Sequence, residues 1–157
     1  MENIKPIKRS EQLISLSREH HDALLFIWKI RQGLKNGTSI SLINDYIKWF
    51  WQNHLVDHFR QEEEILLPYL LQTDPLAAQL ISEHKVIRSM IDQQHDSDSI
   101  STFADILDKH VRFEERELFP QIEKNVPLDQ LNEIAKKLIA HSQCDRHWGN
   151  EFWKSKI

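Results

Sequence analysis

The sequence predicts an all-α protein, an up-down-up-down four-helix bundle that ends in a short fifth helix. Three observations support this prediction. The 157 residues include only three glycines, long stretches contain no helix breaker, and apolar residues recur at spacings of three and four. No segment has the pattern of a strand. We expect one domain over residues 1–157, with a bundle core at about 11–124 and a C-terminal helix and tail at 127–157.

The first helix is expected at about residues 11–32, where leucine and isoleucine recur at core-like spacing. Gly33 is expected to stop it, and Asn36-Gly37 to make the turn that follows. A second helix is expected from Ser39 or Ser41 to about residue 71. Pro68 should kink this helix or end it early, because proline cannot donate the helical hydrogen bond.

The second half of the chain repeats this arrangement. Asp74 is expected to cap a third helix that opens with Pro75, a residue tolerated at the first helical position. A polar loop at residues 95–99 should precede a fourth helix, which begins at about residue 101 and reaches Pro120. A break at residues 125–127 precedes a fifth helix at about 128–141. Three aromatic residues should dock the tail on the bundle: Trp148, Phe152 and Trp153.

Composition excludes several classes of function. The net charge of −4 is modest and the basic residues are scattered, so neither nucleic acid nor an anionic membrane is an expected partner. We find no transmembrane run and no signal peptide. The single cysteine, Cys144, excludes an internal disulfide framework and a cysteine-based zinc site, and it is expected to be a buried or inert thiol. We therefore expect a cytoplasmic protein.

One motif occurs twice and points to chemistry. A histidine is followed four residues later by glutamate, then by a second glutamate, and ten residues after the histidine by proline. The copies are His58-Phe59-Arg60-Gln61-Glu62-Glu63 with Pro68, and His110-Val111-Arg112-Phe113-Glu114-Glu115 with Pro120. Four residues is just over one helical turn, so each imidazole and its carboxylate project from one face. A Glu-His dipeptide precedes each copy, at Glu19-His20 and Glu83-His84, which suggests an internal pseudo-two-fold.

These residues predict a metal centre inside the bundle. Imidazole and carboxylate donors without a thiolate suit a pair of iron or manganese ions, with zinc as an alternative. Ionised carboxylates are costly in a dry core unless cations accompany them. The Glu-x-x-His pairs of ferritin-like bundles and the His-Glu-x-x-His motif of zinc proteases are absent. The expected ligands are His20, His58, Glu62, His84, His110 and Glu114.

Several residues near this set have open assignments. His21 competes with its neighbour His20, which the apolar stripe favours. His54 lies one turn before His58 and could be an additional ligand, an outer hydrogen-bond partner or a plain polar residue. Glu63 and Glu115 could also act from outside the centre, but surface ion pairs with Arg60 and Arg112 are the default expectation. Loop or surface positions are expected for His95, His141 and His147, and core or rim packing for Trp28, Trp49, Phe50 and Trp51.

On these motifs the chain resembles the hemerythrin-like (HHE cation-binding) domain family over roughly residues 16–121. The resemblance implies a four-helix bundle with a non-haem di-iron centre. It implies single ligands at His20 and His84, and paired ligands from the two His-x3-Glu motifs. Their glutamates, Glu62 and Glu114, would bridge two iron ions.

The chain departs from the oxygen-carrying members of that family. Those members have two histidines four residues apart on the third helix, whereas here Arg88 follows His84 at that distance. They also have aspartate five residues after the last histidine, whereas here Glu114 follows at four. The missing histidine implies an open coordination position at the metal centre. The resemblance is then to those family members that handle nitric oxide, peroxide or iron itself.

The predicted function is therefore that of a non-haem di-iron protein that interacts with dioxygen, nitric oxide or peroxide. A role in iron handling or in oxidative or nitrosative stress is part of this prediction. The alternatives are a di-iron enzyme that turns over peroxide or nitric oxide, and a zinc- or manganese-binding bundle without a redox role. The oligomeric state is left open.

Overall fold

The computed structural model describes residues 8–139 and 148–154. Within these ranges the regular structure is helical throughout, so the all-α prediction is confirmed for this part of the chain. Two π-helical turns, Trp51–Leu55 and Glu62–Leu66, flank α3, and a third, Glu114–Leu118, joins α5 to α6. The α-helices are α1 (Ile14–Lys35), α2 (Ile40–Phe50), α3 (Val56–Gln61), α4 (Pro75–Ile91), α5 (Ser97–Phe113), α6 (Phe119–Asn125) and α7 (Leu128–Ile139).

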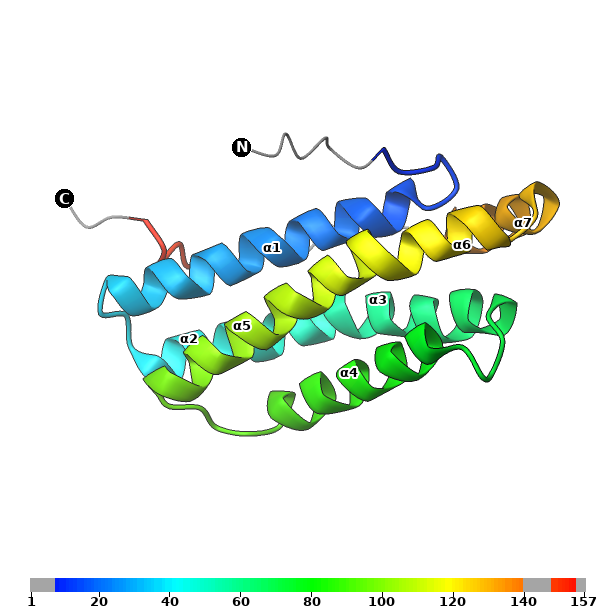
Figure 1. The fold of residues 1–157 in the computed structure, drawn as a ribbon. Coiled ribbons are helices and arrows are strands. Elements are labelled where there is room, and N and C mark those ends of the chain that lie inside the picture. The colour runs from blue at the N-terminus through cyan, green and yellow to red at the C-terminus, as the bar shows by residue number, and fades with distance from the viewer. Residues whose placement is uncertain (1–7, 140–147, 155–157) are drawn as a thin grey trace, which may run out of the picture.

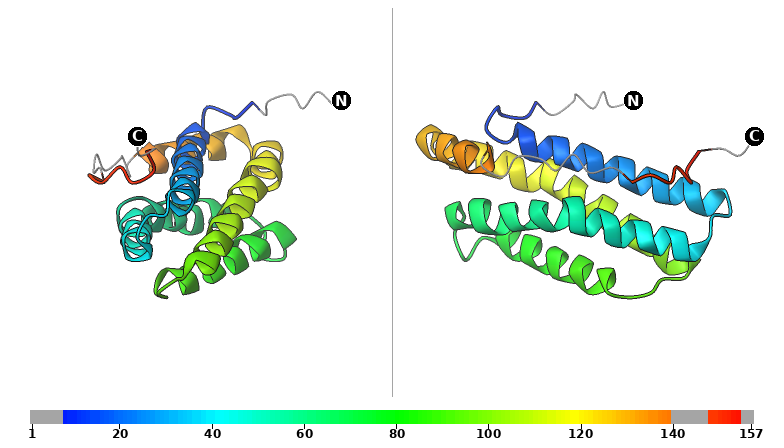
Figure 2. Two further views of the ribbon diagram at one scale, coloured as in Figure 1. Left: turned by 90° about the vertical axis from the view of Figure 1, so that its left-hand side faces the viewer. Right: turned by 180° about the vertical axis from the view of Figure 1, so that it is seen from behind.

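Four long helical segments form the body of the fold. In Figure 1 the chain runs to the left along α1, returns along α2 and α3, runs left again along α4, and returns along α5 and α6. α1 packs against α2 and α5, and α5 also packs against α4. The two further views show the same grouping of segments (Figure 2). α7 contacts the Glu62–Leu66 turn at one end of the bundle.

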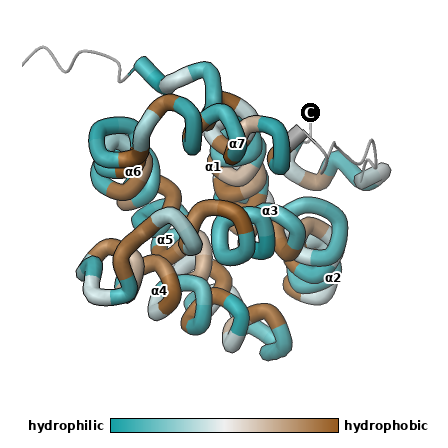
Figure 3. Tube along the Cα trace, turned by 90° about the vertical axis from the view of Figure 1, so that its right-hand side faces the viewer, coloured by the Kyte–Doolittle hydropathy of each residue, from teal (hydrophilic) through white to brown (hydrophobic). Residues whose placement is uncertain are grey.

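Apolar side chains form two buried clusters along the bundle. The first contains aromatic residues such as Phe26 and Phe103, and the second contains Leu16, Leu118 and Phe119. Figure 3 shows hydrophobic and hydrophilic residues on the same helices, as expected for helices with one buried face. None of the helices that the structure describes combines the length and apolarity needed to cross a bilayer.

The prediction that Gly33 stops the first helix was wrong. α1 begins at Ile14 and continues past Gly33 to Lys35. A Cβ atom on Gly33 would lie 2.6 Å from Cε2 of Phe152, so this glycine permits the C-terminal segment to approach the helix. The helix ends instead at Asn36 and Gly37, and Gly37 has a φ of +71° that suits glycine.

The two prolines of the repeated motif differ in effect. Pro68 lies in a short 3-10 turn, Leu67–Tyr69, after which the backbone is extended, so the expected early end is confirmed. Pro120 lies in the first turn of α6, and the helix continues to Asn125. Before each proline a π-helical turn occurs, with hydrogen bonds from Leu67 N–H to Glu62 O and from Phe119 N–H to Glu114 O. The sequence pattern does not predict these turns.

The connection between α4 and α5 lies a few residues earlier than expected, at residues 92–96. Asp74 caps α4 as predicted, by accepting a hydrogen bond from Leu76 N–H at 2.9 Å. α5 begins at Ser97 instead of residue 101. His95 lies in this connection, in agreement with the expected loop position, but its side chain is buried and only 4% exposed. Its backbone N–H donates to Asn44 Oδ1 at 2.9 Å, and its Nε2 donates to Met90 O at 2.6 Å.

The C-terminal aromatic residues dock as predicted. Phe152 is buried, and its ring meets Tyr46 edge-on at a centroid distance of 5.1 Å. Phe50 is buried as predicted, and Trp49 and Trp51 are half-buried. The core or rim position predicted for Trp28 was wrong, since it is 49% exposed. The expectations for His141, Cys144 and His147, and the last turn expected for the fifth helix, fall outside the described residues.

Candidate metal centre

Six ionisable side chains lie in the core of the bundle. α1 and α4 each supply one histidine, His20 and His84. α3 supplies His58, and Glu62 follows one turn later at the start of a π-helical turn. α5 and the next π-helical turn supply His110 and Glu114 in the same way. All six are at most 4% exposed, so the apolar stripes place them in the interior as the sequence predicts.

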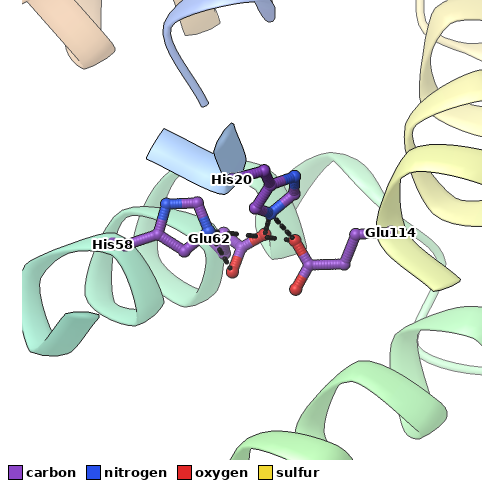
Figure 4. Close-up of side chains that lie close together, drawn as sticks. All are labelled: His20, His58, Glu62 and Glu114. Atoms are coloured by element: carbon purple, nitrogen blue, oxygen red, sulfur yellow. Dashed lines mark hydrogen bonds and ion pairs between the residues drawn. The ribbon is translucent and has the colours of Figure 1, made fainter. Parts of the chain in front are cut away.

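These six side chains form two groups that could each hold a metal ion. In each group, one donor atom per residue lies within 4.8 Å of the donor atoms of the others. Figure 4 shows the first group, whose side chains converge from different helical segments. Glu62 and Glu114 belong to both groups. The first group is His20, His58, Glu62 and Glu114, and the second is Glu62, His84, His110 and Glu114.

The Nε2 atoms of the histidines face the two carboxylates. Nε2 of His58 and Nε2 of His84 each lie 3.2 Å from Glu62 Oε1. Nε2 of His20 lies 2.7 Å from Glu114 Oε2, and Nε2 of His84 lies 3.5 Å from Glu114 Oε1. Nε2 of His110 also contacts Glu114 Oε1. Four nitrogen donors and two carboxylates therefore point toward one another.

On its outer side, each of the four histidines is bonded to another carboxylate through Nδ1. Because an ionised carboxylate can only accept, Nδ1–H is the donor, and a neutral ring then keeps its Nε2 lone pair directed inward. That tautomer is the one a metal ion requires from these rings. The pairs are His20 with Glu115 at 2.8 Å, His58 with Glu19 at 2.5 Å, His84 with Glu63 at 2.9 Å and His110 with Glu83 at 2.7 Å.

These outer contacts correct the default expectation for the second glutamate of each motif. Glu63 and Glu115 were expected to pair with Arg60 and Arg112 on the surface, but they hold histidines instead. Arg60 lies 4.0 Å from an oxygen of Asp57, and Arg112 donates to Asp108 at 2.7 Å. No role at the centre was predicted for Glu19 and Glu83, which hold His58 and His110. The repeated Glu-His dipeptides carried the signal for them.

Six buried polar atoms at the centre have no hydrogen-bond partner. Some are close to an oppositely charged atom, but their geometry is not that of a hydrogen bond. A buried unpaired polar atom costs about 1–3 kcal/mol, so a group of them needs an explanation. Metal ions bound between them would supply the missing partners, and the donor set fits such ions. The atoms are Nε2 of His58, His84 and His110, both carboxylate oxygens of Glu62, and Oε1 of Glu114.

Without metal ions, protons would provide the positive charge. Burial opposes protonation of His84, but the nearby carboxylates of Glu114 and Glu62 outweigh it and raise the pKa to about 9. Burial acts in the same direction on His110, whose pKa Glu114 nevertheless raises to about 10. Burial disfavours the carboxylate of Glu114, yet the charges of His110 and His20 hold its pKa well below the usual value. The buried carboxylates therefore favour positive charge in the centre, whether from protons or from metal ions.

Two of the open candidates do not join the centre. His21 is exposed on α1, whereas its neighbour His20 is buried, in agreement with the preference for His20. His54 belongs to neither group. Its ring stacks on Phe50 at a centroid distance of 5.1 Å and meets Trp49 edge-on.

Arg88 stands where the resemblance implies that a ligand is missing. Its Nη1 atom lies 3.0 Å from Glu63 Oε1, and its guanidinium lies over the ring of Phe59 at 5.7 Å. The arginine therefore binds an outer carboxylate, and it is in neither group of candidate ligands.

Comparison with known proteins gives one result. The model of the hemerythrin HHE cation binding domain matches residues 12–122, a range that contains the six core side chains. No curated protein and no solved structure matches the chain. The match covers well over half of the 157 residues. The chain therefore belongs to the hemerythrin HHE cation-binding domain family.

Proposed function

We propose that this protein binds two non-haem iron ions and uses them to interact with a small molecule. The observation that carries the proposal is that both candidate groups share the same two carboxylates. Two adjacent metal ions bridged by carboxylates need that arrangement. In this proposal His20 and His58 hold one ion, His84 and His110 hold the other, and Glu62 and Glu114 bridge them.

The donor set supports iron over a harder or a softer ion. Imidazole suits iron, zinc and copper, carboxylate suits harder ions, and no thiolate is among the donors. Manganese and zinc accept the same donors and remain the alternative occupants. Either way, cations would offset the cost of burying two carboxylates that are 0% exposed.

The small molecule is proposed to be dioxygen, nitric oxide or peroxide. Each group contains only two histidines and the two shared glutamates as candidate ligands. Arg88, at the position where the oxygen carriers have another histidine, binds Glu63. Bound ferrous ions would supply electrons and open coordination positions to such molecules. Aromatic rings keep the surroundings apolar: Phe59 stacks on His84 at 3.8 Å, and Phe119 stacks on His20 at 5.1 Å.

The remaining expectations stay part of this proposal. Residues 1–157 are proposed to form one domain, with the four segments in up-down-up-down order, which the alternating chain direction in Figure 1 supports. The cytoplasm is the proposed location, on the ground that the chain has only one cysteine. A role in iron handling or in the response to oxidative or nitrosative stress would follow from the chemistry of the small ligand.

Titration of the iron-loaded protein tests the small-molecule interaction. The protein is loaded with ferrous iron under anaerobic conditions, and nitric oxide, dioxygen and peroxide are added in separate titrations followed by visible absorption. We expect a saturable spectral change with at least one of them. His20→Ala should reduce the change and His21→Ala should not, because only His20 lies in the centre. Iron-loaded protein that responds to none of the three would refute the proposal.

The same titration separates a binding protein from an enzyme. A reversible spectrum that returns when the gas is removed indicates a binding or sensing protein. Continuous consumption of peroxide or nitric oxide over many turnovers indicates an enzyme.

A further inference from the structure

Arg88 is bonded to the carboxylate that holds His84. Its Nη1 atom lies 3.0 Å from Glu63 Oε1 and 2.8 Å from Glu63 Oε2. The same Oε2 atom accepts the hydrogen bond from His84 Nδ1 at 2.9 Å. An arginine, a glutamate and a histidine are therefore connected in series from the surface to the centre.

Arg9 makes the matching connection to the other half of the centre. Its Nη2 atom donates to Glu115 Oε2 at 2.9 Å, and Glu115 Oε1 accepts from His20 Nδ1 at 2.8 Å. Its Nη1 atom donates to Glu123 at 2.6 Å. The side chain of Arg9 is only 6% exposed, whereas that of Arg88 is 40% exposed.

An aromatic ring completes the arrangement on each side. Phe59 stacks on His84 with an interplanar angle of 6°, and the guanidinium of Arg88 lies over the same ring. Phe119 stacks on His20 with an interplanar angle of 13°, and Arg9 lies 5.4 Å from its centroid. The sequence repeat does not account for the similar arrangement in the two halves. Arg88 follows His84 by four residues, whereas Arg9 precedes His20 by eleven.

The other two histidines lack such an arginine among the described residues. The outer carboxylate of His58 is Glu19, which Gln61 approaches with its amide at 3.4 Å. The outer carboxylate of His110 is Glu83, which accepts from the amide of Gln79 at 2.7 Å. Each candidate metal group therefore contains one histidine held through an arginine and one held through an amide.

We infer that Arg9 and Arg88 are positioning residues, and that each controls the retention of one of the two metal ions. The inference rests on the proposed di-metal centre. The charged hydrogen bonds from each arginine hold its glutamate in one rotamer, and the glutamate fixes the imidazole plane and tautomer. Loss of the arginine frees the carboxylate to turn toward water, so the histidine it holds binds its metal ion less firmly.

The experiment follows release of ferrous iron from the anaerobically loaded full chain into a chromogenic chelator. Arg88→Met removes the charge and keeps a long stem over Phe59, while Arg88→Lys keeps the charge. Arg112→Met is the matched control, because this exposed arginine is bonded to Asp108 and not to a carboxylate that holds a histidine. We expect Arg88→Met to release one of two ions about 10-fold faster, and the lysine and control variants to match the wild type.

A variant that retains only one metal ion shows which arginine acts on which ion. In His84→Ala, only the group with His20 and His58 keeps both its histidines. There Arg9→Met should accelerate release, Arg9→Lys should accelerate it less because it keeps the charge, and Arg88→Met should have no further effect. Far-UV circular dichroism of both Arg9 variants checks that the helices persist, because Arg9 is buried.

The outcomes separate this inference from the proposed function. If the wild type retains no iron, the di-metal centre fails and the inference fails with it. If the wild type retains two ions and Arg88→Met releases both at the wild-type rate, only the inference is overturned. Equal acceleration of both ions by either arginine variant would also overturn it, because it would show a general loosening of the bundle.

Discussion

His20 and Glu114 are 94 residues apart in the chain, yet Nε2 of His20 lies 2.7 Å from Oε2 of Glu114 in the core. Burial opposes the charge on His20, but the charge and hydrogen bond of Glu114 raise its pKa above the usual value. The metal-free protein therefore keeps protons at the sites where metal ions are proposed to bind. Protons and metal ions compete for the same nitrogen atoms.

This competition predicts how the metal-free protein responds to pH. The pKa is raised to about 9 for His84 and to about 10 for His110, against about 6.5 in an unfolded chain. A raised folded-state pKa stabilises the protein fully below the unfolded value, and this contribution is lost as pH rises through the folded value. Thermal unfolding in excess chelator should show a midpoint that falls between about pH 6.5 and pH 10.

The metal-loaded protein is the control for this prediction. Its histidines are already deprotonated, so its midpoint should change much less over the same range. A midpoint of the metal-free protein that stays constant or rises with pH would show that protons do not occupy the centre.

The shared carboxylates predict unequal effects of two core substitutions. His84 belongs to one group only, so His84→Ala should leave about one iron ion per chain after desalting. Glu114 belongs to both groups, so Glu114→Ala should leave fewer than one. Metal analysis of both variants, with His21→Ala as an exposed control, tests the sharing. Retention of two ions by Glu114→Ala would mean that this glutamate bridges nothing.

The close approach of Phe152 to Gly33 predicts that Gly33→Ala changes the free energy of unfolding in opposite directions in the wild type and in a Phe152→Ala variant. Alanine favours a helix over glycine by about 1 kcal/mol, but its Cβ would meet the ring of Phe152 at 2.6 Å. Loss of a buried phenylalanine contact costs about 1.5–3 kcal/mol. Gly33→Ala should therefore lower the free energy of unfolding by about 1 kcal/mol in the wild type. In a Phe152→Ala background it should raise the free energy by a similar amount.

Denaturant unfolding of the four proteins measures this coupling. Gly149→Ala is the matched control, because a Cβ at Gly149 meets nothing within 4 Å. The same sign in both backgrounds would show that Gly33 is not there to admit Phe152.

The helices and the six core residues followed from local spacing. Apolar stripes and the four-residue His–Glu spacing depend only on helical periodicity, and they identified His58 and Glu62 as inward-facing. The resemblance to a family then implied that the two glutamates bridge two iron ions. Features that depend on distant segments were missed, such as the burial of His95 against Asn44. Gly33 was misjudged for the same reason, because its neighbour Phe152 comes from the far end of the chain.

The outer shell of the centre shows the same limit. Glu63 has an arginine three residues before it, which favours a local ion pair when only the sequence is known. The structure pairs it instead with His84 on a different helix. The π-helical turns at Glu62 and Glu114 were also missed, since a hydrogen bond that reaches back five residues leaves no periodic pattern in so short a stretch.

Metal content per chain tests the central claim most directly. The protein is loaded with ferrous iron under anaerobic conditions, desalted and analysed for metals together with its His58→Ala variant. The account predicts about two iron ions per chain in the wild type and fewer in the variant. No retained metal, or a single ion that His58→Ala leaves in place, would contradict a centre built on the four histidines and two shared glutamates.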